Sequence, residues 1–192
     1  MIFIGDVHGK ISQYLNIINK YSDICSIQVG DFGVGFVDIP WIEIDCRHKF
    51  IRGNHDNPDM SREIPNYLGD YGYYNNIFYV SGAISIDRNY RIEGVDWWRD
   101  EELSYLEMSN MIELYRKFCP RIVVSHEAPT EVVSYLKYNS HNNPTSSALQ
   151  MIFEYNRPEI WIFGHHHLSF RKKINKTLFI GLDELEVYKI GD

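Results

Sequence analysis

Short apolar runs and one helical stripe alternate along the first fifty residues of the chain. Apolar runs at residues 2–4, 25–29 and 48–51 predict three strands. A helix is predicted after the first strand by apolar positions at i, i+3, i+4 and i+7: Ile11, Tyr14, Leu15 and Ile18. A strand, a helix and a strand in this order favour parallel pairing through a right-handed crossover.

The pattern changes after residue 67. Apolar runs at 77–80, 83–86 and 90–92, separated by turn residues, predict an antiparallel arrangement. Helices are then predicted after the acidic residues 100–102 and after Pro129, and over the apolar positions of 148–155, whereas strands are predicted at 121–125, 160–163, 177–180 and 185–190. We find no repeat, low-complexity stretch or linker, so we expect one domain over residues 1–192.

Composition and charge narrow the class of protein. The chain has 192 residues, 44% of them hydrophobic and 23% charged, which is typical of a globular protein with one core. The net charge of -7 argues against a long nucleic-acid duplex as partner, because such partners need a broad cationic face. No apolar run reaches the roughly 18 residues of a membrane span, so we expect no membrane partner.

The cysteines and the N-terminus predict the compartment. Cys25, Cys46 and Cys119 are odd in number, form no CxxC motif and lie in or beside apolar runs, so we expect them to be buried and reduced. The first residues lack the basic and extended apolar parts of a secretory signal. Both observations favour a cytoplasmic protein.

Polar clusters follow five of the predicted strands. They are Gly5-Asp6-Val7-His8-Gly9, Gly30-Asp31, Arg52-Gly53-Asn54-His55-Asp56, Ser125-His126-Glu127 and Gly164-His165-His166-His167. The C-terminal ends of strands in an open α/β sheet converge on one crevice, so these clusters are expected to meet there. Each cluster alone is explained as a turn or a solvated loop, but five of them in this order are not.

The residue types in this crevice predict a metal site. Aspartate, asparagine and imidazole offer mixed oxygen and nitrogen donors, which suit Mn, Fe, Zn, Co or Ni better than Ca. Asp6-x-His8 and His165-x-His167 each place two donors on a short segment. We therefore expect a centre with two divalent metal ions.

In combination, Asp6-x-His8, Gly30-Asp31, Gly53-Asn54-His55-Asp56, His126 and Gly164-His165-x-His167 closely resemble the calcineurin-like metallophosphoesterase superfamily. The resemblance spans residues 6–167. It implies an α/β fold, a four-layer α/β/β/α sandwich of two mixed sheets, with the metal site at the C-terminal ends of the strands.

The resemblance also implies roles for single residues. The ligands of one metal would be Asp6, His8 and His167; those of the other would be Asn54, His126 and His165, with Asp31 bridging both. His55 would contact the phosphate and protonate the leaving oxygen, and Arg52 would hold phosphoryl oxygens and so contact the substrate.

The implied activity is metal-dependent hydrolysis of phosphate esters by a metal-bridging hydroxide. Two cations lower the pKa of a shared water and neutralise charge on the transferred group, while an imidazole with a pKa near neutrality donates a proton. We expect manganese, with Fe, Zn, Ni or Co as alternatives. The choice between phosphomonoesterase and phosphodiesterase stays open.

Some positions depart from the protein-phosphatase branch of the superfamily. Val34 and Gly35 stand where that branch has an aspartate and an arginine, which argues against a Ser/Thr protein phosphatase. The partner that orients His55 is left open between three carboxylates: Asp38, Asp56 and Glu127. His166 is expected to point away from the metals, because side chains alternate on an extended segment.

Two other functions stay open. We expect the substrate to be a phosphorylated small molecule, a nucleotide or an accessible phosphoester end. If it is a nucleotide, Trp97 or Trp98 would stack on the base. Both tryptophans also fit simple packing in the protein. His141 is a further candidate for substrate contact. A catalytically silent scaffold would instead use an exposed apolar patch, for which the candidates are Phe36, Ile39 and Trp41.

Overall fold

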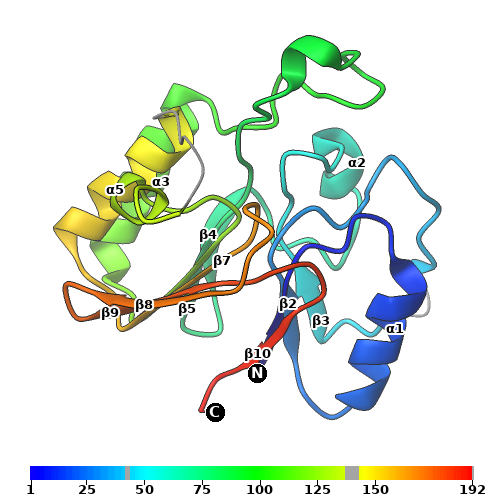
Figure 1. Ribbon diagram of the computed structural model, residues 1–192, viewed down its shortest axis with the longest axis horizontal. Coiled ribbons are helices and arrows are strands. Elements are labelled where there is room, and N and C mark those ends of the chain that lie inside the picture. Colours follow the sequence, from blue (N-terminus) through cyan, green and yellow to red (C-terminus); the bar gives the residue numbers. More distant parts are fainter. Residues whose placement is uncertain (42–43, 137–142, 192) are drawn as a thin grey trace.

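Two mixed β-sheets pack face to face in the computed structural model (Figure 1), which describes residues 1–41, 44–136 and 143–191. The four-stranded sheet has the order β10-β1-β2-β3 and is built from β1 (Ile2–Ile4), β2 (Ser26–Gln28), β3 (His48–Phe50) and β10 (Val187–Lys189). The six-stranded sheet has the order β4-β5-β6-β7-β9-β8. Its strands are β4 (Tyr71–Tyr74), β5 (Ile77–Val80), β6 (Ile122–Ser125), β7 (Ile160–Phe163), β8 (Phe170–Ile174) and β9 (Thr177–Gly181).

Parallel strands form the centre of each sheet. β1, β2 and β3 pair in parallel, as do β5, β6, β7 and β9. The antiparallel strands β10, β4 and β8 lie at sheet edges. Because the central strands of a sheet run in one direction, their C-terminal ends and the loops that follow them share one edge.

Helices cover the outer faces of the two sheets. α1 (Ile11–Lys20) packs on the four-stranded sheet, whereas α3 (Tyr105–Phe118) and α5 (Pro144–Tyr155) pack on the six-stranded sheet (Figure 1). The shorter helices are α2 (Pro58–Arg62), α4 (Thr130–Val133) and the 3-10 helix η2 (Arg88–Tyr90). The layers confirm the expected α/β/β/α sandwich. Within the described ranges, no helix has the length and apolar character to cross a membrane.

The alternation of side chains along buried strands builds three apolar layers from one chain. On β1, Phe3 faces the other sheet, whereas Ile2 and Ile4 face α1. On β7, Ile162 lies between the sheets and Trp161 packs under the helices. Strands buried on both faces are continuous hydrophobic runs, which explains why the sequence identified them readily.

The expectation for residues 83–92 was wrong. The antiparallel pair lies before these residues: β4 pairs with β5, and the two strands are joined by Asn75 and Asn76, both in the left-handed region. Residues 83–86 and 90–92 form no strand: they are irregular except for a turn at Ile86, which is 88% exposed, and the end of η2 at Tyr90. Ile86 and its neighbours leave the sheet in an excursion of residues 84–99, drawn in green at the top of Figure 1.

Local chemistry explains where other elements differ from expectation. α3 begins at Tyr105 rather than beside the acidic run, because Ser104 accepts from the Glu107 N–H and the Glu107 carboxylate accepts from the Ser104 N–H. β8 has no apolar alternation to detect, because Arg171, Lys172 and Lys173 are exposed on an edge strand.

The prediction that the cysteines are buried was also wrong. Cys46 and Cys119 are exposed and Cys25 is half-buried, and all three are free thiols. Cys119 ends α3 in the left-handed region, just outside the helix face that packs on the sheet. Apolar sequence neighbours therefore did not predict burial at element ends.

Replacing Ile162 by Ala is expected to destabilise the protein by about 2–5 kcal/mol, because it leaves a cavity between the two sheets. The matched control is Ile92→Ala, where the side chain is 65% exposed and the effect should stay within about 0.5 kcal/mol. Urea unfolding of both variants measures the difference. Equal midpoints for the two would contradict the placement of β7 in the inter-sheet core.

Candidate metal centre

The loops that follow β1, β2, β6 and β7 bring four of the polar clusters together. Their carboxylate and imidazole atoms form two groups that could each hold an ion, with all atoms of a group within 4.8 Å of one another. One group is Asp6, His8, Asp31 and His167; the other is Asp31, His126 and His165. Asp31 belongs to both groups, as the bridging role requires.

The first group brings His167, from the loop after β7, next to Asp6 and His8, from the loop after β1. His8 Nε2 lies 2.9 Å from His167 Nε2 and 3.8 Å from an Asp31 oxygen. His167 Nε2 lies 3.2 Å from Asp6 Oδ2. Two nitrogen ligands at about 2.0–2.1 Å from one ion lie about 2.8–3.4 Å apart in octahedral or tetrahedral geometry, so the 2.9 Å between the two imidazole nitrogens fits a shared metal.

The second group is more deeply buried. His126 Nε2 lies 3.5 Å from Asp31 Oδ1 and 3.1 Å from the side-chain oxygen of Asn54, which adds the third predicted donor. His126 and Asp31 are at most 1% exposed. Imidazole nitrogen, carboxylate oxygen and amide oxygen together suit a divalent transition metal.

Hydrogen bonds behind these donors fix which atoms face the centre. His126 Nδ1 lies 2.8 Å from the carbonyl of Val29, so Nδ1–H donates to that carbonyl and Nε2 faces Asp31. The Asn54 amide donates to Ser85 Oγ at 3.0 Å, so its oxygen faces inward. Partners of this kind orient ligands and raise their affinity for metal.

The backbone at the centre is strained in the way functional sites often are. His8, Asp31, His165 and His167 all have positive φ, between 45° and 66°. A residue other than glycine in this region costs about 1–3 kcal/mol, and the cost persists only where the surroundings enforce it. Gly53 and Gly164 relieve crowding, because a Cβ at these positions would collide with Asp31 and Asp6 respectively.

Buried charge makes the centre a place for cations. Burial opposes charge on His126, but the adjacent Asp31 carboxylate raises the pKa of its imidazole to about 10. In return His126, with His55 and His8, outweighs burial and holds the pKa of Asp31 well below its usual range. Burial lowers the pKa of His165 to about 3, which keeps that ring neutral. Anionic Asp31 among imidazole nitrogens fits divalent cations.

The family assignment follows from the sequence as a whole. Residues 1–169 match the family model described as calcineurin-like phosphoesterase. The chain belongs to the calcineurin-like phosphoesterase family. A search of curated proteins found no match to the sequence.

Solved structures share the fold of this phosphoesterase at low sequence identity. A 5′-nucleotidase candidate from Staphylococcus aureus aligns with a TM-score of 0.56 and 14% identity, over 97% of this chain and 49% of its own. GAP50, described as the anchor in the inner membrane complex of Plasmodium, aligns with a TM-score of 0.51 and 11% identity, over 95% and 71%. The phosphopantetheinyl hydrolase of Mycobacterium tuberculosis gives a TM-score of 0.48 and 13% identity, over 95% and 89%. The phosphoesterase chain thus spans about half the length of the first of these.

His55 of the phosphoesterase lies beside the ligand groups. Its backbone N–H donates to Asp31 Oδ1 at 2.9 Å, and its ring centre is 5.7 Å from that of His8. The side chain lines a cavity of about 560 Å³ together with Asp31, Asn54 and His165. Partial burial lowers its pKa, with Asp31 opposing the change.

None of the three carboxylates considered for orienting His55 forms a hydrogen bond to its ring in the described structure. Asp38 is exposed. Asp56 is buried and accepts four backbone N–H groups, from Phe32, Gly33, Val34 and Gly53. Asp56 therefore ties together the loops after β2 and β3.

Glu127, the third of these carboxylates, binds His166 instead. Its Oε1 lies 2.8 Å from His166 Nε2, and its Oε2 accepts from the Asn143 amide at 3.0 Å. Burial raises its pKa, but the neighbouring His165 and the hydrogen bond with His166 outweigh that effect and lower the pKa to about 2. His166 is in neither ligand group, as the alternation of side chains predicted.

The structure places the Arg52 guanidinium in the protein interior, away from the cavity where its predicted role would put it. The side chain is 1% exposed, and its guanidinium donates to Asp70 Oδ1 at 2.8 Å and to the Glu101 carbonyl at 2.6 Å. Arg52 is not among the described residues that line the cavity. The family resemblance suggested a phosphoryl contact for Arg52, but its hydrogen bonds to Asp70 and Glu101 hold it in the interior.

The other substrate candidates are Trp97, Trp98 and His141. Trp97 and Trp98 are not among the described residues that line the cavity, and Trp98 is 8% exposed against the ring of Phe36. Packing therefore accounts for Trp98. His141 lies outside the described residues. Sequence reasoning missed Ser85 and Glu101, whose hydrogen bonds of 2.5 and 3.0 Å support Asn54 from behind, and no motif marks either residue.

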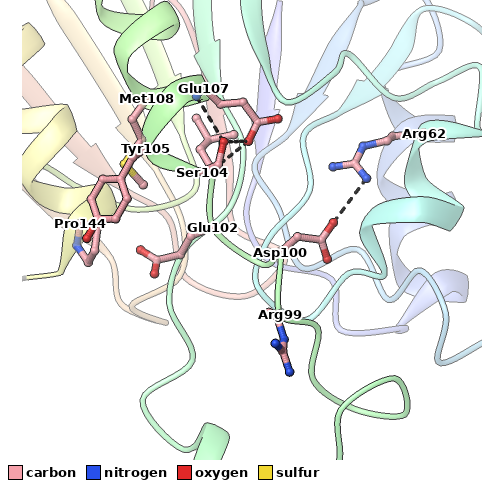
Figure 2. Close-up of a pocket in the computed structure, with 10 residues that line it drawn as sticks. Arg62, Arg99, Asp100, Glu102, Ser104, Tyr105, Glu107, Met108 and Pro144 are labelled. Carbon is pink, nitrogen blue, oxygen red and sulfur yellow. Dashed lines mark hydrogen bonds and ion pairs between the residues drawn. The ribbon is translucent and has the colours of Figure 1, made fainter.

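A second cavity, of about 360 Å³, opens at the start of α3 (Figure 2). Its polar groups already have partners within the protein. Arg62 binds Asp100, Glu107 caps α3 through Ser104, and Glu102 accepts from Thr145. With these groups satisfied, we assign no ligand to this cavity.

Metal-stripped protein is expected to bind two Mn²⁺ per chain in titration calorimetry. Asp31→Asn should weaken both sites at least tenfold, because second-shell changes alone cost about 10–100-fold and Asp31 touches both ligand groups. His167→Ala should lose one ion and keep the other. Asp59→Asn, in an exposed carboxylate, is the matched control. Two full-strength sites in Asp31→Asn would contradict the bridging arrangement.

Asp56→Asn is expected to destabilise metal-free protein by about 2–4 kcal/mol, because one amide oxygen replaces two carboxylate oxygens and leaves buried N–H groups unpaired. Urea unfolding against Asp59→Asn measures it. A fully stable variant whose pH–rate profile shifts would instead assign Asp56 to the orientation of His55.

Proposed function

We propose that this calcineurin-like phosphoesterase hydrolyses phosphate esters with two divalent metal ions, manganese being the first candidate. The observation that carries the proposal is the sharing of Asp31 between two adjoining ligand groups. Two bound ions supply a water of lowered pKa and neutralise charge on the phosphoryl group. A single structural metal would need one closed group and no shared carboxylate.

The chain's own residues supply the rest of the reaction. Asp6, His8 and His167 would hold one ion, and Asn54, His126 and His165 the other. His55 lines the cavity next to both groups, so a proton held on its ring is within reach of a leaving oxygen. The Asp31–His55 backbone bond fixes the loop that carries it.

The substrate proposed is a small or locally accessible phosphate ester. Arg52 no longer argues for a terminal phosphoryl group, because its guanidinium is bonded in the interior. The nucleotide alternative has no stacking ring from Trp97 or Trp98 at the described cavity wall. The cavity wall therefore favours a substrate without a nucleobase.

Only one of the three residues suggested for a scaffold surface is exposed. Phe36 is 43% exposed, but Ile39 and Trp41 are half-buried against the core around α1. Trp41 stacks on Phe50 with ring centres 5.3 Å apart. The residues proposed for that surface therefore stabilise the fold instead.

Metal-stripped protein reloaded with Mn²⁺ is expected to hydrolyse p-nitrophenyl phosphate or bis(p-nitrophenyl) phosphate. His55→Ala should lower kcat by about 10²–10⁴-fold, the usual contribution of a general acid, while two Mn²⁺ still bind. The ratio of the two rates chooses between monoesterase and diesterase.

A comparison of leaving groups separates proton donation from a merely structural effect. Phenyl phosphate releases a stronger base than p-nitrophenyl phosphate, so the defect of His55→Ala should be larger for phenyl phosphate. An equal loss for both esters would remove His55 as the proton donor. No turnover by wild-type protein with two bound ions would overturn the hydrolase and favour the scaffold.

A further inference from the structure

Residues 84–89 form one wall of the cavity that contains His55. The segment begins the excursion between β5 and α3 and includes the start of η2, in the part of the chain drawn green at the top of Figure 1. Ile84, Ile86, Asp87, Arg88 and Asn89 all line the cavity. A loop outside the sandwich therefore meets the metal centre.

Arg88 differs from the other arginines of the described chain. Eight bind carboxylates: Arg47, Arg52, Arg62, Arg91, Arg99, Arg116, Arg121 and Arg171. Arg157 lies over the ring of Phe153. Within residues 1–41, 44–136 and 143–191, the Arg88 guanidinium has no hydrogen bond or ion pair. A cation without a protein partner, at the wall of a cavity beside buried carboxylates, is available to an anionic ligand.

The backbone that carries Arg88 is held from both sides. Arg91 forms a fork with Asp87, with both bonds at 2.7 Å, and donates to the Asp96 carbonyl at 3.2 Å. Ser85 is fixed by Glu101 through its N–H and its hydroxyl. Arg91 thus neutralises Asp87, the acidic neighbour that would otherwise compete for Arg88.

Apolar side chains form the rest of this wall. Ile84 and Ile86 line the cavity from the excursion, and Val133 and Leu136 line it from α4 and the turn after it. Among the described lining residues the aromatic rings are all imidazoles, so the cavity presents no phenyl or indole ring on which a nucleobase could stack. Aliphatic carbon is the chemistry that this surface matches.

We propose that residues 84–89 are the substrate-recognition wall, where Arg88 binds an anionic oxygen of the phosphate group and Ile84 and Ile86 contact an aliphatic leaving group. The inference rests on the proposed phosphoesterase function and adds a substrate class to it, namely phosphate esters of aliphatic alcohols. Arg88 takes the role that the sequence had suggested for Arg52.

The test measures binding rather than turnover. Titration calorimetry on Mn²⁺-loaded protein compares methylphosphonate with hexylphosphonate, whose carbon–phosphorus bonds resist hydrolysis. Each fully buried methylene is worth roughly fourfold in affinity, so partial burial of five should favour hexylphosphonate at least tenfold. Arg88→Ala should weaken both ligands about tenfold, as expected for loss of a charge-assisted hydrogen bond, and Arg88→Lys should recover part of the loss.

Matched controls lie on the same excursion. Arg99→Ala removes an exposed arginine that pairs with Glu93, and it should bind both phosphonates like wild type. Ile86→Ser should lower the ratio of hexylphosphonate to methylphosphonate affinity, whereas Ile92→Ser, which does not line the cavity, should leave the ratio unchanged.

The outcomes separate the inference from the proposed function. Normal phosphonate binding by Arg88→Ala, or equal affinity of wild type for both phosphonates, would overturn the recognition wall even if aryl phosphates are hydrolysed. Selective, Arg88-dependent binding without hydrolysis of any ester would support the wall and overturn the hydrolase. Metal-loaded protein that binds neither phosphonate would overturn both.

Discussion

The arrangement of the metal centre depends on one buried residue, Asp31, which interacts with the loops after β1, β3 and β6. The backbone carbonyl of Asp31 accepts from the N–H groups of Val7 and His8, which holds the loop after β1. Its side chain accepts from the His55 N–H after β3 and faces His126 after β6. A charge this deeply buried is tolerated only beside cations, so the geometry that unites the loops also requires the imidazoles around Asp31, and it fits the proposed metal ions.

The sandwich was predicted from the resemblance to the family, and the meeting of the polar clusters was predicted from the strands that precede them. Each buried strand is an apolar run, and each run ends in polar residues that the topology must bring to one edge. The sequence pattern did not predict in which direction a side chain points once the strand has ended. Asn54 and Arg52 are two positions apart beyond the end of β3, yet Asn54 reaches His126 and Arg52 turns toward Asp70, because the chain bends at residues 54–56.

The excursion of residues 84–99 escaped prediction for a different reason. Its apolar residues suggested strands, but they have no partner strand, and Tyr90 is 93% exposed. Its shape depends on ion pairs and turns, such as the fork between Arg91 and Asp87, which carry no periodic signal. Binding specificity usually resides in loops that a rigid scaffold supports. Residues 84–99, whose structure the sequence did not predict, therefore include the segment that we propose recognises the substrate.

Arg52 and Glu101 connect these two parts of the protein. Arg52 donates to the Glu101 carbonyl, and the Glu101 carboxylate accepts from Ser85, which in turn accepts from the amide of the ligand Asn54. Arg52, which the family resemblance placed on the substrate, therefore anchors the far end of the excursion, while Ser85 at its near end orients Asn54, the proposed ligand. A displacement of residues 84–89 would move Ser85 and, through it, the oxygen that Asn54 presents, so substrate recognition and metal geometry share one set of hydrogen bonds.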